Sequence, residues 1–191
     1  SRGGARVSPY ADGLRKWVQP AGPREDADPV RVSRVFVALR RGVLAASPAV
    51  LGLAPSERLP RVWAVLADLD VGPEVLAVAC VADGTSSLYT GSGGAILGAG
   101  AQPAVRAAAG QLLEAAERVL DALPAADRIA LPAPSSVAFL VMAYEGMRRL
   151  EVPEAEALDP ACAAHELYVA TRDVVAELRQ LSIEAGVNLI G

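Results

Sequence analysis

Two carboxylates one residue apart, Asp68 and Asp70, are the side chains whose types and spacing best suit chemistry. They end an alternating apolar run, Arg61–Val71, which predicts a strand with both aspartates on one face. Paired carboxylate oxygens at a strand end could hold Mg²⁺ for chemistry on a phosphate. Enzymes that bind Mg²⁺ in this way for chemistry on a phosphate also need a downstream lysine and a further acidic pair. The only lysine of this sequence is Lys16. We therefore interpret the two aspartates as a strand end that enters solvent.

A glycine-rich segment, Gly91–Gly100, precedes a predicted helix and could cradle an anion, because helix N-termini present free N–H groups. Its spacing fits neither phosphate-binding fingerprint. A P-loop needs Gly-Lys before Ser or Thr, and a G-x-G-x-x-G motif would need glycine where Ile96 or Pro103 stands. We interpret these glycines as tight turns beside a sheet. Together with the two aspartates, they leave one alternative open: a small nucleotide- or Mg²⁺-binding enzyme or sensor.

Histidine and cysteine offer little further chemistry. His165, the only histidine, falls off the apolar stripe of its predicted helix beside Glu166, so we expect a solvated side chain. Cys80 has apolar neighbours, and without CxxC spacing Cys80 and Cys162 should be reduced and packed. One histidine and two distant cysteines cannot form a closed zinc site. We therefore expect no catalytic residue, no cofactor and no metal.

A second set of side chains favours binding to a protein. Aromatic and methionine side chains lie around two predicted hairpins, arginines follow the polar side of a predicted helix, and a tryptophan stands in the N-terminal segment. Such residue types are enriched at protein interfaces. The interaction residues that we predict are Trp17, Arg34, Arg41, Tyr89, Tyr144 and Met147.

The composition, with 52% hydrophobic residues among 191, allows a sizeable buried core. A net charge of −4 disfavours a dedicated nucleic-acid binder. Apolar runs such as Val75–Ala82 are too short to span a bilayer, and no segment resembles a signal peptide. We therefore expect a cytoplasmic protein without a transmembrane segment. Arginine supplies nearly all of the 18 basic residues, a bias typical of GC-rich bacterial genomes.

The charges are unevenly distributed along the chain. Basic residues crowd the N-terminal quarter, and acidic residues dominate the C-terminal part. Complementary fields of this kind favour self-association, so the expected partner is a protein or a second copy. The arginine-rich N-terminal part leaves a further alternative, binding to an anionic surface.

The elements that would position these residues follow from periodicity and turn signals. Residues 1–29 hold Gly, Pro and charge without periodicity, which predicts an arm or linker before a single domain at 30–191. Helices are predicted over Val30–Ala46, over Pro103–Leu123 and from an N-cap at Asp159. Strands are predicted at Arg61–Val71, Glu74–Ala82, Thr85–Thr90, Ala95–Leu97, Arg128–Leu131, Val137–Tyr144 and Met147–Val152.

Turn residues and alternation join these strands into one sheet. Asp83-Gly84 supplies the positive φ angles of a tight hairpin, and Glu145-Gly146 marks a second one. In the first strand, alternation places Trp63 and Val65 on one face and Asp68 on the other. The order of elements predicts an α+β domain: a single antiparallel meander sheet of five to six strands with helices packed on it.

This order over residues 30–183 resembles the roadblock, longin and profilin-like group. The segments WAVLADLDVG, VADGTSSLYTGSGG and FLVMAYEGMRRLE also resemble a group of uncharacterised bacterial proteins. The first resemblance implies scaffolding, regulation of small GTPases or dimeric adaptor assembly. Since fold does not imply function, these roles are analogies. Our expectation is a non-catalytic interaction or scaffold module that self-associates or binds a protein partner.

Overall fold

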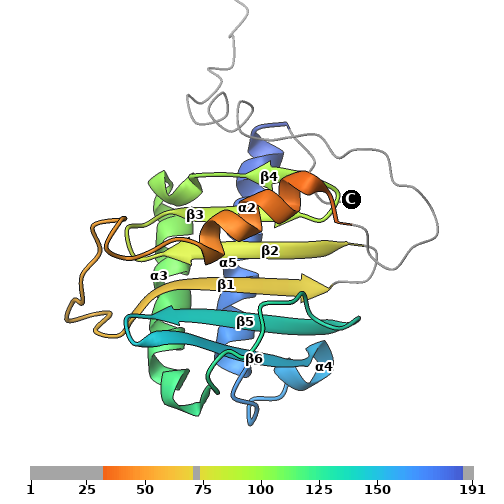
Figure 1. The fold of residues 1–191 in the computed structure, drawn as a ribbon. Helices are drawn as coiled ribbons and strands as arrows, with labels where there is room; N and C mark the ends of the chain where they lie inside the picture. The colour runs from red at the N-terminus through yellow and green to blue at the C-terminus, as the bar shows by residue number, and fades with distance from the viewer. Residues whose placement is uncertain (1–31, 71–73, 187–191) are drawn as a thin grey trace, which may run out of the picture.

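Six antiparallel strands form one sheet in the computed structural model, which describes residues 32–70 and 74–186 (Figure 1). The order across the sheet is β4-β3-β2-β1-β5-β6. The strands are β1 (Val62–Asp70), β2 (Val75–Val81), β3 (Ser86–Thr90), β4 (Ala95–Ile96), β5 (Ser136–Ala143) and β6 (Gly146–Pro153). The predicted α+β class with one antiparallel sheet is confirmed. The roadblock- or profilin-like relationship stays a prediction.

The strands come from two parts of the chain. β1 to β4 follow one another as a meander, and β5 then pairs with the other side of β1. β1 is therefore central, and all nine of its residues are buried. The two predicted hairpin turns are present, with positive φ at Gly84 (+93°) and at Gly146 (+135°).

Helices cover both faces of the sheet. α2 (Arg34–Leu44) crosses one face, and α3 (Pro103–Val119) and α5 (His165–Glu184) lie side by side across the other (Figure 1). Short helical turns lie at η1 (Ala99–Ala101), η2 (Leu120–Ala122) and α4 (Glu154–Ala157). Within the described residues, no helix is apolar for long enough to cross a bilayer.

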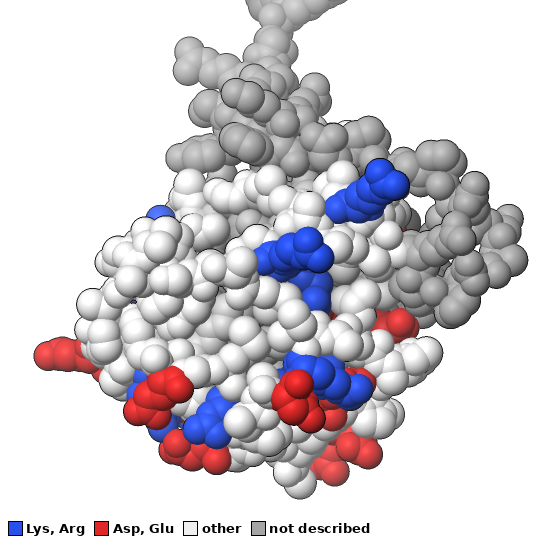
Figure 2. Space-filling model, viewed as in Figure 1, with Lys and Arg blue, Asp and Glu red and all other residues white. Residues whose placement is uncertain are grey.

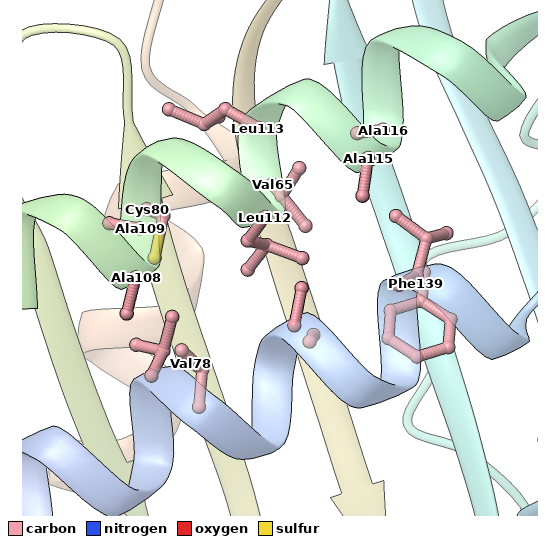
Figure 3. Close-up of a cluster of buried hydrophobic side chains, with 14 of the residues drawn as sticks. Val65, Val78, Cys80, Ala108, Ala109, Leu112, Leu113, Ala115, Ala116 and Phe139 are labelled. Atoms are coloured by element: carbon pink, nitrogen blue, oxygen red, sulfur yellow. The ribbon is translucent and has the colours of Figure 1, made fainter. Parts of the chain in front are cut away.

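The larger core fills the space between the sheet, α3 and α5 (Figure 3). α3 buries a stripe of small side chains together with Leu112 and Leu113. Leu112 lies among Val65, Val78 and Phe139. The alanines of α3, such as Ala109, let the helix approach its neighbours closely and bury apolar surface. This stripe is the buried face of the helix, and Pro103 stands at its first position, where the predicted helix begins.

A smaller core lies under α2 and contains Phe36, Leu66, Tyr89 and Trp63. The sequence prediction placed Trp63 on the opposite face, together with Val65, and this is wrong. The pairing of β1 with β5 shifts between Val62 and Ala64, so Trp63 is an extra residue in a β-bulge. The bulge reverses the alternation and turns the indole toward α2.

Two helices begin later than predicted, and one predicted strand is absent. α2 begins at Arg34 because the hydroxyl of Ser33 accepts from the backbone N–H of Phe36 at 3.1 Å. α5 begins at His165, since Asp159 instead caps a turn by accepting from Ala161 N–H at 2.9 Å. Residues 128–131 form no strand but belong to a loop over the α2 face. The predicted arm, residues 1–29, lies outside the described residues.

Candidate functional site

Asp68 lies on the α2 side of β1, and its carboxylate is 0% exposed. Arg40 of α2 donates to it through Nε at 3.1 and 3.0 Å and through Nη2 at 2.7 Å. Burial raises the pKa of the Asp68 carboxyl, while the hydrogen bonds and charge of Arg40 oppose that rise. The prediction that this strand end enters solvent is therefore wrong. Asp68 anchors a helix to the sheet.

Arg40 also ties α2 to the loop before β5. Its Nη2 donates to the backbone carbonyl of Ile129 at 2.7 Å, in addition to Asp68. One guanidinium thus joins α2, the central strand and a loop about ninety residues away in sequence. Because the group is desolvated and makes charge-assisted hydrogen bonds in a fixed plane, it holds these three parts in one geometry.

Ion pairs and a hydrogen bond with β6 hold the same loop, residues 128–133. Arg149 Nη2 donates to Glu151 Oε2 at 2.6 Å, and Arg128 Nη2 donates to the same oxygen at 2.8 Å. Glu151 Oε1 accepts from the N–H of Ala133 at 2.9 Å. Burial alone would raise the pKa of Glu151, but that hydrogen bond and the two arginines lower it. These contacts hold residues 128–133 over the sheet as a loop.

Asp70 and the first glycines of Gly91–Gly100 lie at one end of the sheet. Asp70 pairs in register with Val75, whose carbonyl accepts from Gly91 N–H at 2.7 Å. Asp70 Oδ1 also accepts from the N–H of Ser135 at 3.2 Å. The structure therefore brings Asp70 close to the start of the glycine-rich segment.

The rest of that segment lies at the opposite end of β3. β4 runs back along β3 and carries Gly98 and Gly100 to the β2–β3 turn. A Cβ on Gly100 would stand 1.5 Å from the carbonyl oxygen of Gly84. The glycines thus serve two separate turns, as their predicted structural use requires.

His165 and the cysteines have structural surroundings. His165, expected to be a solvated side chain, is half-buried, and its Nδ1 lies 3.0 Å from the carbonyl oxygen of Ala157. Burial raises the pKa of the Cys80 thiol to about 12, and Cys162 is a second free cysteine. Within residues 32–70 and 74–186, no three His, Cys, Asp or Glu side chains form a group that could hold a metal ion.

The predicted interaction residues that the structure describes belong to α2 or to the face beneath it. Arg34 and Arg41 are exposed on α2, Tyr89 is buried under the helix at 4% exposure, and Tyr144 and Met147 are half-buried at the β5–β6 hairpin. The sixth predicted residue, Trp17, lies outside the described residues. Tyr89, Tyr144 and Met147 therefore belong to or pack against the smaller core under α2, whereas Arg34 and Arg41 lie on the exposed side of the helix.

A groove runs between α2 and the loop at Ile129–Leu131, with a volume of about 340 Å³. Val37 and Ile129 on its two sides are 42% and 52% exposed. Figure 2 shows arginines over α2, a charged band toward β6 and uncharged surface between them. The residues that line this groove, called the α2 groove below, are Val32, Phe36, Val37, Arg40, Arg41, Leu44, Ala45, Ile129 and Leu131.

Sequence reasoning missed this groove because it treated residues 128–131 as a strand. The α2 sequence itself carried a signal of an exposed binding surface. It has valines on more than one side of the helix, and three arginines without an acidic residue.

Comparison with models of protein families, with curated proteins and with solved structures gave no significant match.

Proposed function

We propose that this protein is a non-catalytic interaction module that binds a protein, either a partner or a second copy, through the α2 groove. The groove itself is the observation that carries the proposal. Exposed Val37 and Ile129 lie on its two sides above the buried ring of Phe36. Removing such apolar surface from water stabilises a complex, and contiguous patches of this kind are typical of binding sites.

The alternative, a nucleotide- or Mg²⁺-binding enzyme or sensor, has less support from the geometry. Both carboxylate oxygens of Asp68 accept from Arg40. The glycines of Gly91–Gly100 are divided between the two ends of β3. A phosphate cradle needs adjacent backbone N–H groups that converge on one point.

A bacterial cytoplasm is the setting that we propose for this module. Cys80 and Cys162 are both free thiols, which suits a reducing compartment. The bias toward arginine over lysine supports a bacterial source.

Light scattering over a concentration range and retention of partners from a bacterial extract would test the proposal. The variant Val37→Asp places a charge in the groove. Val169→Asp is the matched control, because Val169 is 43% exposed on α5, on the other face of the sheet. We expect self-association or retention in the wild type and in V169D, and its loss in V37D.

A wild type that stays monomeric and retains nothing that V37D loses would contradict the proposal. A thermal-shift screen with nucleotides and Mg²⁺ tests the alternative directly. A shift that Asp70→Asn abolishes would favour a nucleotide or metal site over an interaction module.

A further inference from the structure

We propose that the α2 groove takes an acidic–apolar peptide segment. A large apolar side chain would enter the groove, and flanking Asp or Glu side chains would pair with Arg34 and Arg41. This inference rests on the proposed function and names the chemistry of the partner.

The groove has the size and lining for side chains of a peptide. Its volume of about 340 Å³ is at the small end of the range for ligand pockets, which is about 300–1,000 Å³. Phe36 and Val37 come from α2, and Leu131 comes from the loop. These groups offer an apolar surface with few polar atoms to orient a small molecule. An aliphatic or aromatic anchor residue suits such a surface.

Charge decides which flanking residues suit the groove. α2 carries three arginines and no acidic residue, and no carboxylate lines the groove. Asp68 neutralises Arg40. Arg41 lines the groove, and Arg34 stands outside the lining on the same helix. Both are exposed, and within the described residues neither forms an ion pair. The groove is therefore positively charged, and a carboxylate-bearing partner would complement it.

The spacing of the two arginines sets the spacing of the carboxylates. Arg34 and Arg41 stand seven positions apart on α2. At 1.5 Å per residue this is about 10 Å along the helix axis. That span equals about two helical turns, or about three residues of an extended strand. A segment with acidic residues on both sides of one apolar anchor residue can place its carboxylates at this spacing.

Both walls of the groove are already held in place. Arg40 joins α2 to the carbonyl of Ile129, and Glu151 holds the same loop through Arg128. Glu151 also accepts from Arg149, so its charge is balanced by arginines on its own side of the loop. A preorganised groove loses less conformational entropy when it binds, which favours a short segment as the ligand.

Selection from a displayed library of random peptides tests this chemistry without a known partner. The targets are the wild type, the double variant Arg34→Glu/Arg41→Glu and the control Arg179→Glu. Arg179 is an exposed arginine of α5 on the other face. We expect the wild type and R179E to enrich peptides with Asp or Glu beside an aliphatic or aromatic residue. The double variant should lose that enrichment.

A selected peptide, synthesised with a fluorophore, then gives affinities by anisotropy. We expect binding to weaken by about tenfold or more in R34E/R41E, and when NaCl rises from about 50 to about 500 mM. V37D should also lose binding of the peptide, whereas the affinity of R179E should stay within about twofold of the wild type.

Three results would overturn the inference: no enriched peptide, neutral or basic peptides, or equal loss in R179E. V37D-sensitive self-association that the acidic peptide does not displace would also overturn it, because a second copy would then occupy the groove by other chemistry. In each case the proposed function still stands if V37D alone abolishes association. It fails separately if V37D has no effect.

Discussion

Replacing Arg40 by methionine is the most direct test of how α2 is held to the sheet. The change keeps an unbranched apolar stem but removes all three hydrogen bonds to the carboxylate of Asp68. That carboxylate is 0% exposed, so water cannot replace the lost donors. The carbonyl of Ile129 loses its donor as well.

Breaking a buried pair from one side costs about 3–5 kcal/mol, because an uncompensated charge stays in the interior. For a chain of this size we expect the melting temperature to fall by roughly 6–20 °C. Replacing both partners, Arg40→Met with Asp68→Leu, removes the stranded charge. Such double replacements are often neutral or stabilising, so we expect the double variant within about 1–2 kcal/mol of the wild type.

Urea unfolding at pH 7 measures these differences. Arg58→Met is the matched control, since Arg58 pairs with Glu114 at the surface, where the side chains are 64% and 33% exposed. That pair should contribute at most about 1 kcal/mol. An R40M variant that loses no more stability than R58M would refute the reasoning. So would a double variant as unstable as R40M.

The same experiment has a pH dependence with a defined sign. Burial raises the pKa of Asp68, and without Arg40 only the charge of Arg149 on β6 opposes that rise. For an acid whose pKa is raised by folding, the penalty is present above the folded pKa and is relieved as the pH falls below it. The deficit of R40M relative to the wild type should therefore shrink as the pH falls from 7 toward 3.8, the ordinary pKa of the unfolded carboxyl.

Four further predictions concern other parts of the fold. Gly100→Ala should destabilise by about 1–3 kcal/mol or more in urea unfolding, because its methyl would stand 1.5 Å from a carbonyl oxygen. Gly42→Ala, with open space around it on α2, should instead stabilise by about 0.5–1 kcal/mol. Ellman's reagent at pH 8 should modify the half-buried Cys162 first, and Cys80 only after urea unfolds the protein, since burial raises the Cys80 pKa to about 12. Burial alone would raise the pKa of Glu117, but hydrogen bonds from Arg61 and from the N–H groups that begin β1 lower it. Glu117→Gln should therefore destabilise at pH 7, with a gap to the wild type that narrows as the pH falls below about 4.5.

The strands and hairpins could be predicted from sequence because their signals are local. Asp83-Gly84 and Glu145-Gly146 each stand between two apolar runs, and their backbone angles depend on two residues. The helix at Pro103–Val119 is equally local, with a proline at its start and one apolar stripe. Such features do not depend on what the rest of the chain does.

The candidate site could not be predicted because it depends on contacts between distant residues. Asp68 has the sequence context of an exposed strand end and becomes buried only when α2 brings Arg40 onto it. The segment around Ile129 is apolar enough for a strand, but ion pairs from β6 hold it as a loop. The β-bulge at Trp63 likewise follows from pairing with a strand far along the chain.

The central position of β1 has a consequence during synthesis on the ribosome. Its partner on one side, β2, follows immediately, whereas β5 follows only after β2, β3, β4 and α3. A nascent chain that ends before β5 therefore leaves one edge of a fully buried strand without hydrogen-bond partners. Non-local pairing of this kind slows folding and prolongs exposure of an aggregation-prone edge. The pairing that completes the middle of the sheet is thus also the one that the newly made chain must wait for.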